Sequence, residues 1–226
     1  ISPLKIGMSI RVKDLEKDIV ANPDRPLPQK LLTPDQVKSV ILNLHRLMYI
    51  LVLVFAFYVN LQTGFWYWVI TFYLGLMYKE FYIGEVLEKQ IVFYGLTHQI
   101  VIVPLCIFAA TGWTMKSLGL GFFVLGSFFS YEICRKLDPK AHPILRTYLS
   151  VYGPKLCFLF VLLLNFLSAF AAYKLGLGYW AWILEGVSIL SFAVIFFLPH
   201  RYKIVELVAT LSLLAHIWGY YLEIHI

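Results

Sequence analysis

A charged stretch near the start of the chain carries side chains that could bind a metal ion and an anion together. Arg11, Asp14 and Asp18 are separated by three and four residues, which places them on one stripe of a helix. Two carboxylates on one stripe suit a hard cation such as Mg²⁺, whose coordination is completed by phosphate oxygens and water. An ordinary solvated helix end with internal ion pairs has the same spacing. Spacing alone therefore leaves both interpretations open.

A proline-rich segment, residues 22–34, follows this stretch. Its prolines predict an extended chain. The segment is either a stiff linker or a rigid lid that holds Arg25 over an anion bound through the metal. At its end Thr33 is the predicted N-cap of the next helix, with Pro34 at the first helical position and Gln36 completing a capping box.

Two further groups of charged residues lie at the ends of apolar runs. Glu132, Arg135 and Lys136 would share one face if the helix continues to residue 136, and would then offer a carboxylate and two cations to an anionic ligand. Lys79 is another candidate phosphate-binding cation. The alternative interpretation is that these basic residues only mark cytoplasmic helix ends.

Three ionisable residues stand apart from these groups. Glu185 lies deep in an apolar run, where an ionisable group is costly and normally faces a cavity or a partner. His98 is more simply interpreted as a hydrogen-bonded core residue. Glu206 lies nearer the end of its run and is expected to pair with Arg201 or Lys203.

The elements that must position these residues are membrane-spanning helices. Of the 226 residues, 60% are apolar and 14% charged, too few charges for a water-facing surface. This composition excludes a disordered chain, a secreted disulfide scaffold and an ordinary cytosolic enzyme. Seven continuous runs approach the ~20 apolar residues that cross a bilayer, which predicts an all-α, polytopic transmembrane bundle. They are 38–60, 62–80, 91–113, 117–133, 151–173, 177–199 and 203–222.

The first residues, 1–10, form half a span that runs into the charged stretch at 11–18. We therefore expect the end of an upstream helix whose first half lies outside this sequence, and a single transmembrane domain over 1–226. No basic, apolar and small-residue series of a signal peptide is found. The cysteines, Cys106, Cys134 and Cys157, share no metal or redox spacing and are interpreted as packing residues.

The basic residues predict how the bundle is oriented. Successive connections between the runs lie alternately on the two sides of the membrane. The connections on one side hold fourteen Lys or Arg, whereas those on the other side hold Lys116 and Lys174. The positive-inside rule assigns the first face, which bears the predicted site, to the cytoplasm or its matrix or stromal equivalent. The bases form no aromatic-interleaved patch, so nucleic acid is not an expected partner.

Two motifs resemble the UbiA superfamily of intramembrane prenyltransferases, in a divergent branch. The first is 11–18, RVKDLEKD, with RPLP at 25–28; the second is 132–136, EICRK, with Thr-Tyr at 147–148. The resemblance covers most of the chain and implies a nine-helix architecture with a truncated start, the seven runs being its third to ninth helices. Arg11 stands where typical members have their first aspartate, and Gly75 stands where they have a tyrosine.

The resemblance also implies chemistry and residue roles. Mg²⁺ on Asp14 and Asp18 would neutralise a prenyl diphosphate, and the prenyl group would pass to an aromatic or lipid-alcohol acceptor buried in the same cavity. The catalytic residues would be Asp14, Asp18 and Glu132, and the diphosphate-binding residues Arg11, Arg25, Lys79, Arg135 and Lys136.

Three alternatives remain open at this point. A terpene cyclase of the same superfamily would ionise the diphosphate without an acceptor, and a degenerate member would bind isoprenoids without turnover. A transporter could use Glu185 and His98 as a relay, although the polar residues crowd one face instead of crossing the bilayer.

Overall fold

The computed structural model describes residues 15 and 17–225, and the side chains of this part up to residue 223. The described chain is helical and contains no strand, which confirms the all-α prediction. It divides into two compact units, 1–94 and 95–226. A single domain over the whole chain stays a prediction.

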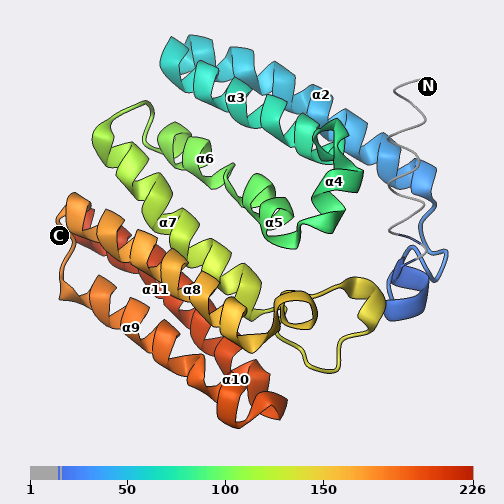
Figure 1. Ribbon diagram of the computed structural model, residues 1–226. Helices are drawn as coiled ribbons and strands as arrows, with labels where there is room; N and C mark the ends of the chain where they lie inside the picture. Colours follow the sequence, from blue (N-terminus) through green and yellow to red (C-terminus); the bar gives the residue numbers. More distant parts are fainter. Residues whose placement is uncertain (1–14, 16, 226) are drawn as a thin grey trace. The chain divides into compact units, whose positions relative to one another are not determined.

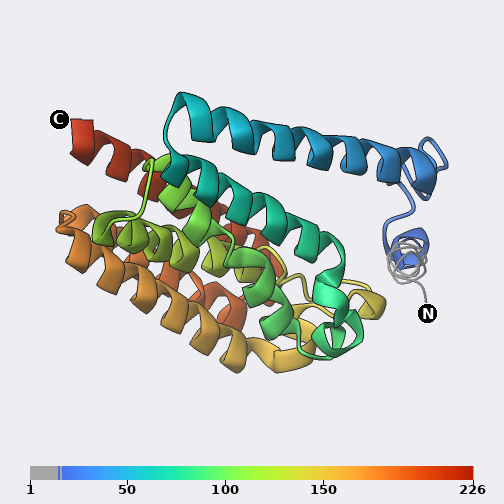
Figure 2. The same cartoon turned by 90° about the horizontal axis from the view of Figure 1, so that it is seen from above.

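Unit 1 is built on two long helices that pack against each other (Figures 1 and 2). The hydroxyl of Thr33 accepts a hydrogen bond from the Gln36 amide and the Gln36 side chain accepts one from the Thr33 amide, which confirms the predicted capping box. Gly64 allows the two helices to approach closely, because a Cβ there would collide with Ala56. The helices of unit 1 are α2 (Pro34–Tyr58), α3 (Leu61–Tyr78), η1 (Glu80–Tyr82), α4 (Gly84–Lys89) and the start of α5 (Ile91–Gln99).

Unit 2 has a core of four helices in which α7 contacts α8 and α11, and α9 contacts α8 and α11 (Figure 1). Phe123, Ala172 and Ala181 are fully buried in this core. Gly126 brings α7 against α8, since a Cβ at this position would strike the Leu164 carbonyl. After α5 the helices are α6 (Ile102–Ala109), α7 (Met115–Cys134), η2 (Pro143–Leu145), α8 (Tyr148–Leu175), α9 (Tyr179–Ser191), α10 (Ala193–Phe197), η3 (Pro199–Arg201) and α11 (Tyr202–His225).

Six helical segments of the described chain are long and apolar enough to cross a membrane. This result supports a multi-pass membrane protein in contact with lipid. The segments are Pro34–Tyr58, Ile91–Ala109, Met115–Cys134, Tyr148–Leu175, Tyr179–Phe197 and Pro199–Glu223.

The seventh predicted span, 62–80, differs from the other six. Its residues form α3, a helix of 18 residues, but α3 does not belong to the set of apolar segments in the described chain. The reason is its composition, because α3 contains tryptophans, tyrosines, threonines and a glutamine beside its aliphatic residues. Seven equivalent apolar spans are therefore not found.

Several predicted spans are interrupted. The 91–113 run breaks at residues 100–101 between α5 and α6, because Pro104 has no N–H for the carbonyl four residues earlier. The 177–199 run breaks at Phe192 between α9 and α10. Within α8, Gly153 adopts φ +69° directly before Pro154, so the first turn of α8 is offset from the rest.

Candidate functional site

Asp18 is the described member of the predicted metal-binding pair. It lies on a helical turn at residues 17–21. Its carboxylate accepts hydrogen bonds from Arg25 Nη1 at 2.8 and 3.0 Å and from Asn22 Nδ2 at 2.9 Å. The Asp18 side chain is 21% exposed and that of Arg25 is 59% exposed, so the guanidinium remains open to solvent while it holds the carboxylate.

The segment that carries Arg25 folds into consecutive turns, so the predicted extended conformation is wrong. The amide of Arg25 donates to the Asn22 carbonyl, that of Gln29 to Arg25, and that of Lys30 to Leu27. Proline fixes φ near −65°, a value that turns share with extended chain. Lys30 adopts φ +58°, the left-handed conformation in which glycine is usual. These turns bring Arg25 back onto Asp18.

An ion pair anchors the helical turn that bears Asp18. Lys17 Nζ lies 3.0 Å from Glu88 Oε1 of α4, and both side chains are only partly exposed. Arg11 and Asp14 lie outside the described residues. The Asp14–Asp18 pair and the Arg11 stripe therefore stay predictions.

Lys79 caps the end of α3 and borders a groove within unit 1. Its Nζ donates to Tyr82 Oη at 2.7 Å and lies 5.1 Å from the centre of the Tyr82 ring. The groove has a volume of about 310 Å³ and runs between α2 and α3 past His45, Phe72 and Gly75. His45 fits there because position 75 has no side chain, since a Cβ would collide with the imidazole.

The turn that presents Tyr82 to Lys79 is strained. Glu80, Phe81 and Tyr82 all adopt positive φ, at 46°, 53° and 60°. Each non-glycine residue in this conformation costs roughly 1–2 kcal/mol. Surrounding contacts must stabilise the turn, among them the packing of the Phe81 ring on Tyr73 at 5.3 Å between centroids.

The second predicted cluster forms at the end of α7 in unit 2. Glu132 is 7% exposed, and its carboxylate contacts Arg135 Nε at 2.5 Å and Lys136 Nζ at 2.6 Å. Arg135 is the C-cap of α7, and this turn brings both cations around one buried acid, as the spacing predicts. The carboxylate of Glu132 raises the pKa of the Arg135 guanidinium, which stays charged at any physiological pH.

The ring of Tyr148 lies beside the cluster. Tyr148 is 1% exposed, and Lys136 Nζ lies 5.8 Å from the centre of its ring. Thr147 caps α8 at the preceding position by accepting a hydrogen bond from the Ser150 amide. Gly95 of α5 leaves space for the Tyr148 hydroxyl, because a Cβ would collide with it. The downstream Thr-Tyr pair therefore has a definite structural role.

The cluster keeps a net positive charge and unused hydrogen-bond donors. One carboxylate and two cations sum to +1, and the Arg135 and Lys136 side chains are 44% and 41% exposed. A guanidinium carries five N–H donors and an ammonium three, more than Glu132 can accept. The arrangement can therefore bind an oxyanion on its exposed side.

Comparison of the chain with protein-family models, with curated proteins and with solved structures gave no match. Function is therefore argued from the motifs and the geometry of the chain itself.

The predicted site residues fall into two groups. Asp18, Arg25 and Lys79 belong to unit 1, whereas Arg135 and Lys136, with their shared acid, belong to unit 2. Their convergence on one ligand stays a prediction. Within the described residues, no three His, Cys, Asp or Glu side chains form a metal-binding group, so the Mg²⁺ site also stays a prediction.

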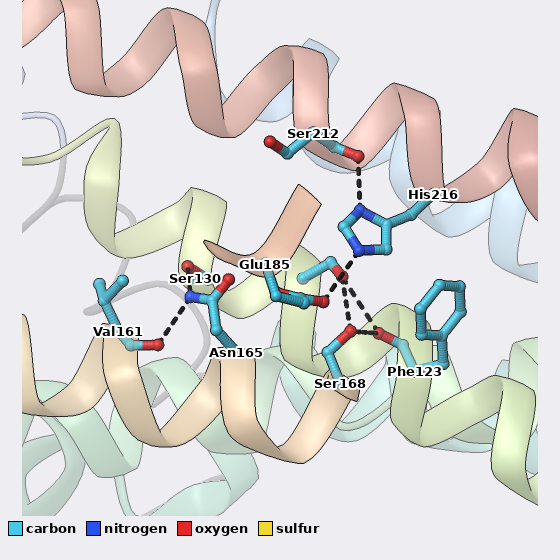
Figure 3. A network of polar contacts seen from close by, with 9 residues as sticks. Phe123, Ser130, Val161, Asn165, Ser168, Glu185, Ser212 and His216 are labelled. Atoms are coloured by element: carbon cyan, nitrogen blue, oxygen red, sulfur yellow. Dashed lines mark hydrogen bonds and ion pairs between the residues drawn. The ribbon is translucent and has the colours of Figure 1, made fainter. Parts of the chain in front are cut away.

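The three ionisable residues that stand apart in the sequence, Glu185, His98 and Glu206, each lie close to a partner in the structure. Glu206 Oε2 lies 2.6 Å from Lys203 Nζ, as expected. Glu185, 3% exposed, has its Oε1 at 2.8 Å from Nε2 of His216, which is 1% exposed. Glu185 was expected to face a cavity or a partner, and it faces a partner (Figure 3). Thr97 Oγ1 lies 3.4 Å from the ring of His98.

Sequence reasoning missed His216 and the polar residues around it. These residues follow helical spacing within apolar runs, which was the available signal. The spacing is three between Ser127 and Ser130, three between Glu185 and Ser188, and four between Ser212 and His216.

Proposed function

We propose that the chain is an integral membrane prenyltransferase that moves a prenyl group from an isoprenoid diphosphate to a lipophilic or aromatic acceptor within the bilayer. The observation that carries the proposal is the cluster at the end of α7. A nearly buried acid, Glu132, gathers Arg135 and Lys136 at the end of a membrane-spanning helix and leaves their outer faces free to bind an oxyanion. A ligand with an anionic head and an apolar tail matches this position.

Asp18 and Arg25 provide the second line of support. Their donor chemistry fits a Mg²⁺–diphosphate ligand, because a carboxylate prefers the metal and a guanidinium prefers phosphate oxygens. Asp14 and Asp18 would hold the ion, and Mg²⁺ bound there would supply positive charge to the phosphate oxygens. In the structure Arg25 neutralises Asp18, so diphosphate binding would transfer the Arg25 guanidinium from the carboxylate to phosphate.

The proposed reaction breaks the allylic C–O bond and forms a bond to the acceptor. The diphosphate leaves with the electron pair of the C–O bond, and Arg135 and Lys136 stabilise its growing negative charge by donating hydrogen bonds. The sequence motifs alone assign the same role to Arg25 and Lys79. The allylic cation is attacked by the acceptor, which then loses a proton. Aromatic side chains of the apolar bundle would stabilise the cation through their ring faces and keep water away.

Product analysis tests this proposal. The purified protein is incubated with labelled geranylgeranyl diphosphate, Mg²⁺ and a lipid extract that contains acceptors. We compare the natural chain with an Arg135→Gln, Lys136→Gln double variant and with Lys174→Gln. Lys174 is a matched control, because it is an exposed cation of unit 2 at the opposite end of α8 from Tyr148.

The expected result is a prenylated acceptor, formed at least tenfold more slowly by the double variant and normally by the control. A labelled hydrocarbon formed without any extract would instead identify a cyclase. Diphosphate binding without product would identify a binding protein. Equal rates in all three proteins would show that the α7 cluster takes no part in the reaction.

A further inference from the structure

The core of unit 2 contains a cluster of polar side chains around a small gap. The gap leaves no room for a water molecule. Polar side chains at mid-membrane depth are rare and mark functional positions. The polar lining consists of Ser127 and Ser130 of α7, Asn165 of α8, Glu185 and Ser188 of α9, and Ser212 and His216 of α11. Figure 3 labels five of these residues, namely Ser130, Asn165, Glu185, Ser212 and His216.

The hydrogen positions on His216 follow from its neighbours. Nδ1 lies 2.5 Å from the backbone oxygen of Ser212. A carbonyl oxygen can only accept, so Nδ1 must carry a hydrogen. Nε2 therefore faces Glu185 Oε1, 2.8 Å away, with either a lone pair or a second hydrogen. Two lone pairs would repel at this distance, so the pair as a whole carries one further hydrogen, either on Nε2 or on the carboxyl group.

Both carboxylate oxygens of Glu185 and Nε2 of His216 are fully buried, and none of the three makes a regular hydrogen bond to the residues that the structure describes. Oε1 has His216 as an ion-pair partner, whereas Oε2 has none. The hydroxyls and amide nearby are engaged with each other or with the backbone: Asn165 Nδ2 donates to Ser130 Oγ at 2.9 Å, and Ser127 Oγ lies 3.0 Å from Ser168 Oγ. The carboxyl group is thus held by His216 alone.

Among the described residues, no other charged group faces this pair. The residues of α7 and α8 that line the gap are two serines and Asn165, and α9 and α11 add only serines, Ala209 and Leu213 to the pair itself. The aromatic neighbours of the imidazole are Phe123 and Trp180. The other charged residues of the described parts of these helices do not line the gap; they are Lys116 and Glu132 of α7, Lys155 and Lys174 of α8, and Lys203, Glu206 and Glu223 of α11.

We propose that Glu185 and His216 form a proton-binding site that holds one proton in the interior of unit 2. With one proton on either group the pair is neutral overall. Loss of that proton would leave an uncompensated negative charge, and gain of another would leave a positive one, each at high cost in this interior. This inference does not rest on prenyl transfer.

Thermal unfolding of the purified chain at different pH values tests the site. We compare the natural chain with Glu185→Gln, His216→Gln, the double variant and Glu206→Gln. Glu206 is the matched control, because it is an acid of α11 in an exposed ion pair with Lys203.

The two single variants should respond to pH in opposite directions. In His216→Gln the lone carboxyl stays neutral in the fold and releases its proton on unfolding, so its Tm should fall as pH rises, by on the order of 10 °C between about pH 5 and 8. In Glu185→Gln the lone imidazole stays neutral and takes up a proton on unfolding, so its Tm should fall as pH drops below about 6.5. In the natural chain the folded pair keeps one proton while the unfolded imidazole releases its own above about pH 6.5, so its Tm should be level below that pH and fall above it. Glu206→Gln should follow the natural chain, and the double variant should show neither change.

Single variants that follow the profile of the natural chain would overturn the proposal. If the single variants do not fold, nitrogen NMR of histidine-labelled protein keeps the proposal testable, with the neutral double variant assigning the signal of His216. A His216 signal that stays constant between about pH 5 and 8 supports the site. A signal that titrates freely in this range overturns it.

Discussion

Glutamine in place of Glu132 would remove the negative charge that gathers the α7 cluster without changing the size of the side chain. The carboxylate forms ion pairs with Arg135 at 2.5 Å and Lys136 at 2.6 Å. The Glu132 side chain is 9% exposed, whereas the side chains of the two cations are 44% and 41% exposed. Solvent still reaches the cations, so each pair should stabilise the fold by about 0.5–1 kcal/mol, as surface pairs do. Breaking a fully buried pair would cost more, roughly 3–5 kcal/mol.

The expected loss in free energy of unfolding is therefore about 1–2 kcal/mol for the two pairs together, since glutamine can still accept one hydrogen bond. For a chain of this size that loss lowers the Tm by roughly 2–8 °C. Thermal unfolding in detergent measures it, with Glu206→Gln as the control. Glu206 forms an ion pair with Lys203, whose side chain is 67% exposed, and acts on Arg135 only from a greater distance than Glu132 does. Its replacement should therefore cost no more than about 0.5 kcal/mol.

Equal Tm values for Glu132→Gln and Glu206→Gln would refute this reasoning. They would mean that the buried position of Glu132 adds nothing to its ion pairs. A loss far above the predicted range would show instead that solvent does not reach Arg135 and Lys136 as their exposure indicates.

Thermal unfolding checks three further predictions. Lys30→Gly should stabilise unit 1 by up to about 1 kcal/mol, because glycine adopts the left-handed φ of +58° without strain; an unchanged or lower Tm contradicts this. Gly95→Ala should destabilise unit 2 by about 1–3 kcal/mol, since the new methyl group collides with the Tyr148 hydroxyl, and Tyr148→Phe should restore part of the loss. Asn165→Leu should destabilise it by about 1–3 kcal/mol through the lost bonds to Ser130 and the backbone; a loss below about 0.5 kcal/mol would contradict that role.

Local rules predicted much of the fold. The Thr33 capping box follows from short-range hydrogen-bond geometry and is confirmed. The grouping of Arg135 and Lys136 around Glu132 follows from helical spacing and is also found. Six of the seven apolar runs are membrane-spanning candidates, because apolar length is a strong signal.

Features that depend on tertiary context were not predictable in the same way. The prolines near Arg25 allow both turn and extended conformations. Backbone hydrogen bonds, such as that from the Lys30 amide to the Leu27 carbonyl, stabilise the turns. The run 62–80 was predicted to be a span because it is continuous, although its tryptophans and tyrosines are less apolar than the aliphatic residues beside them. His216 could be paired with Glu185 only when the packing of α11 on α9 was known.

The measurement that tests the proposed function most directly is diphosphate release from farnesyl and geranylgeranyl diphosphates, with and without Mg²⁺ and with an acceptor-containing extract present. The purified chain is compared with an Asp14→Ala, Asp18→Ala double variant and with Lys174→Gln. The account predicts Mg²⁺-dependent release by the natural chain and by the control, and loss of release in the double variant. No release from either prenyl diphosphate, or equal release by the double variant, would contradict it.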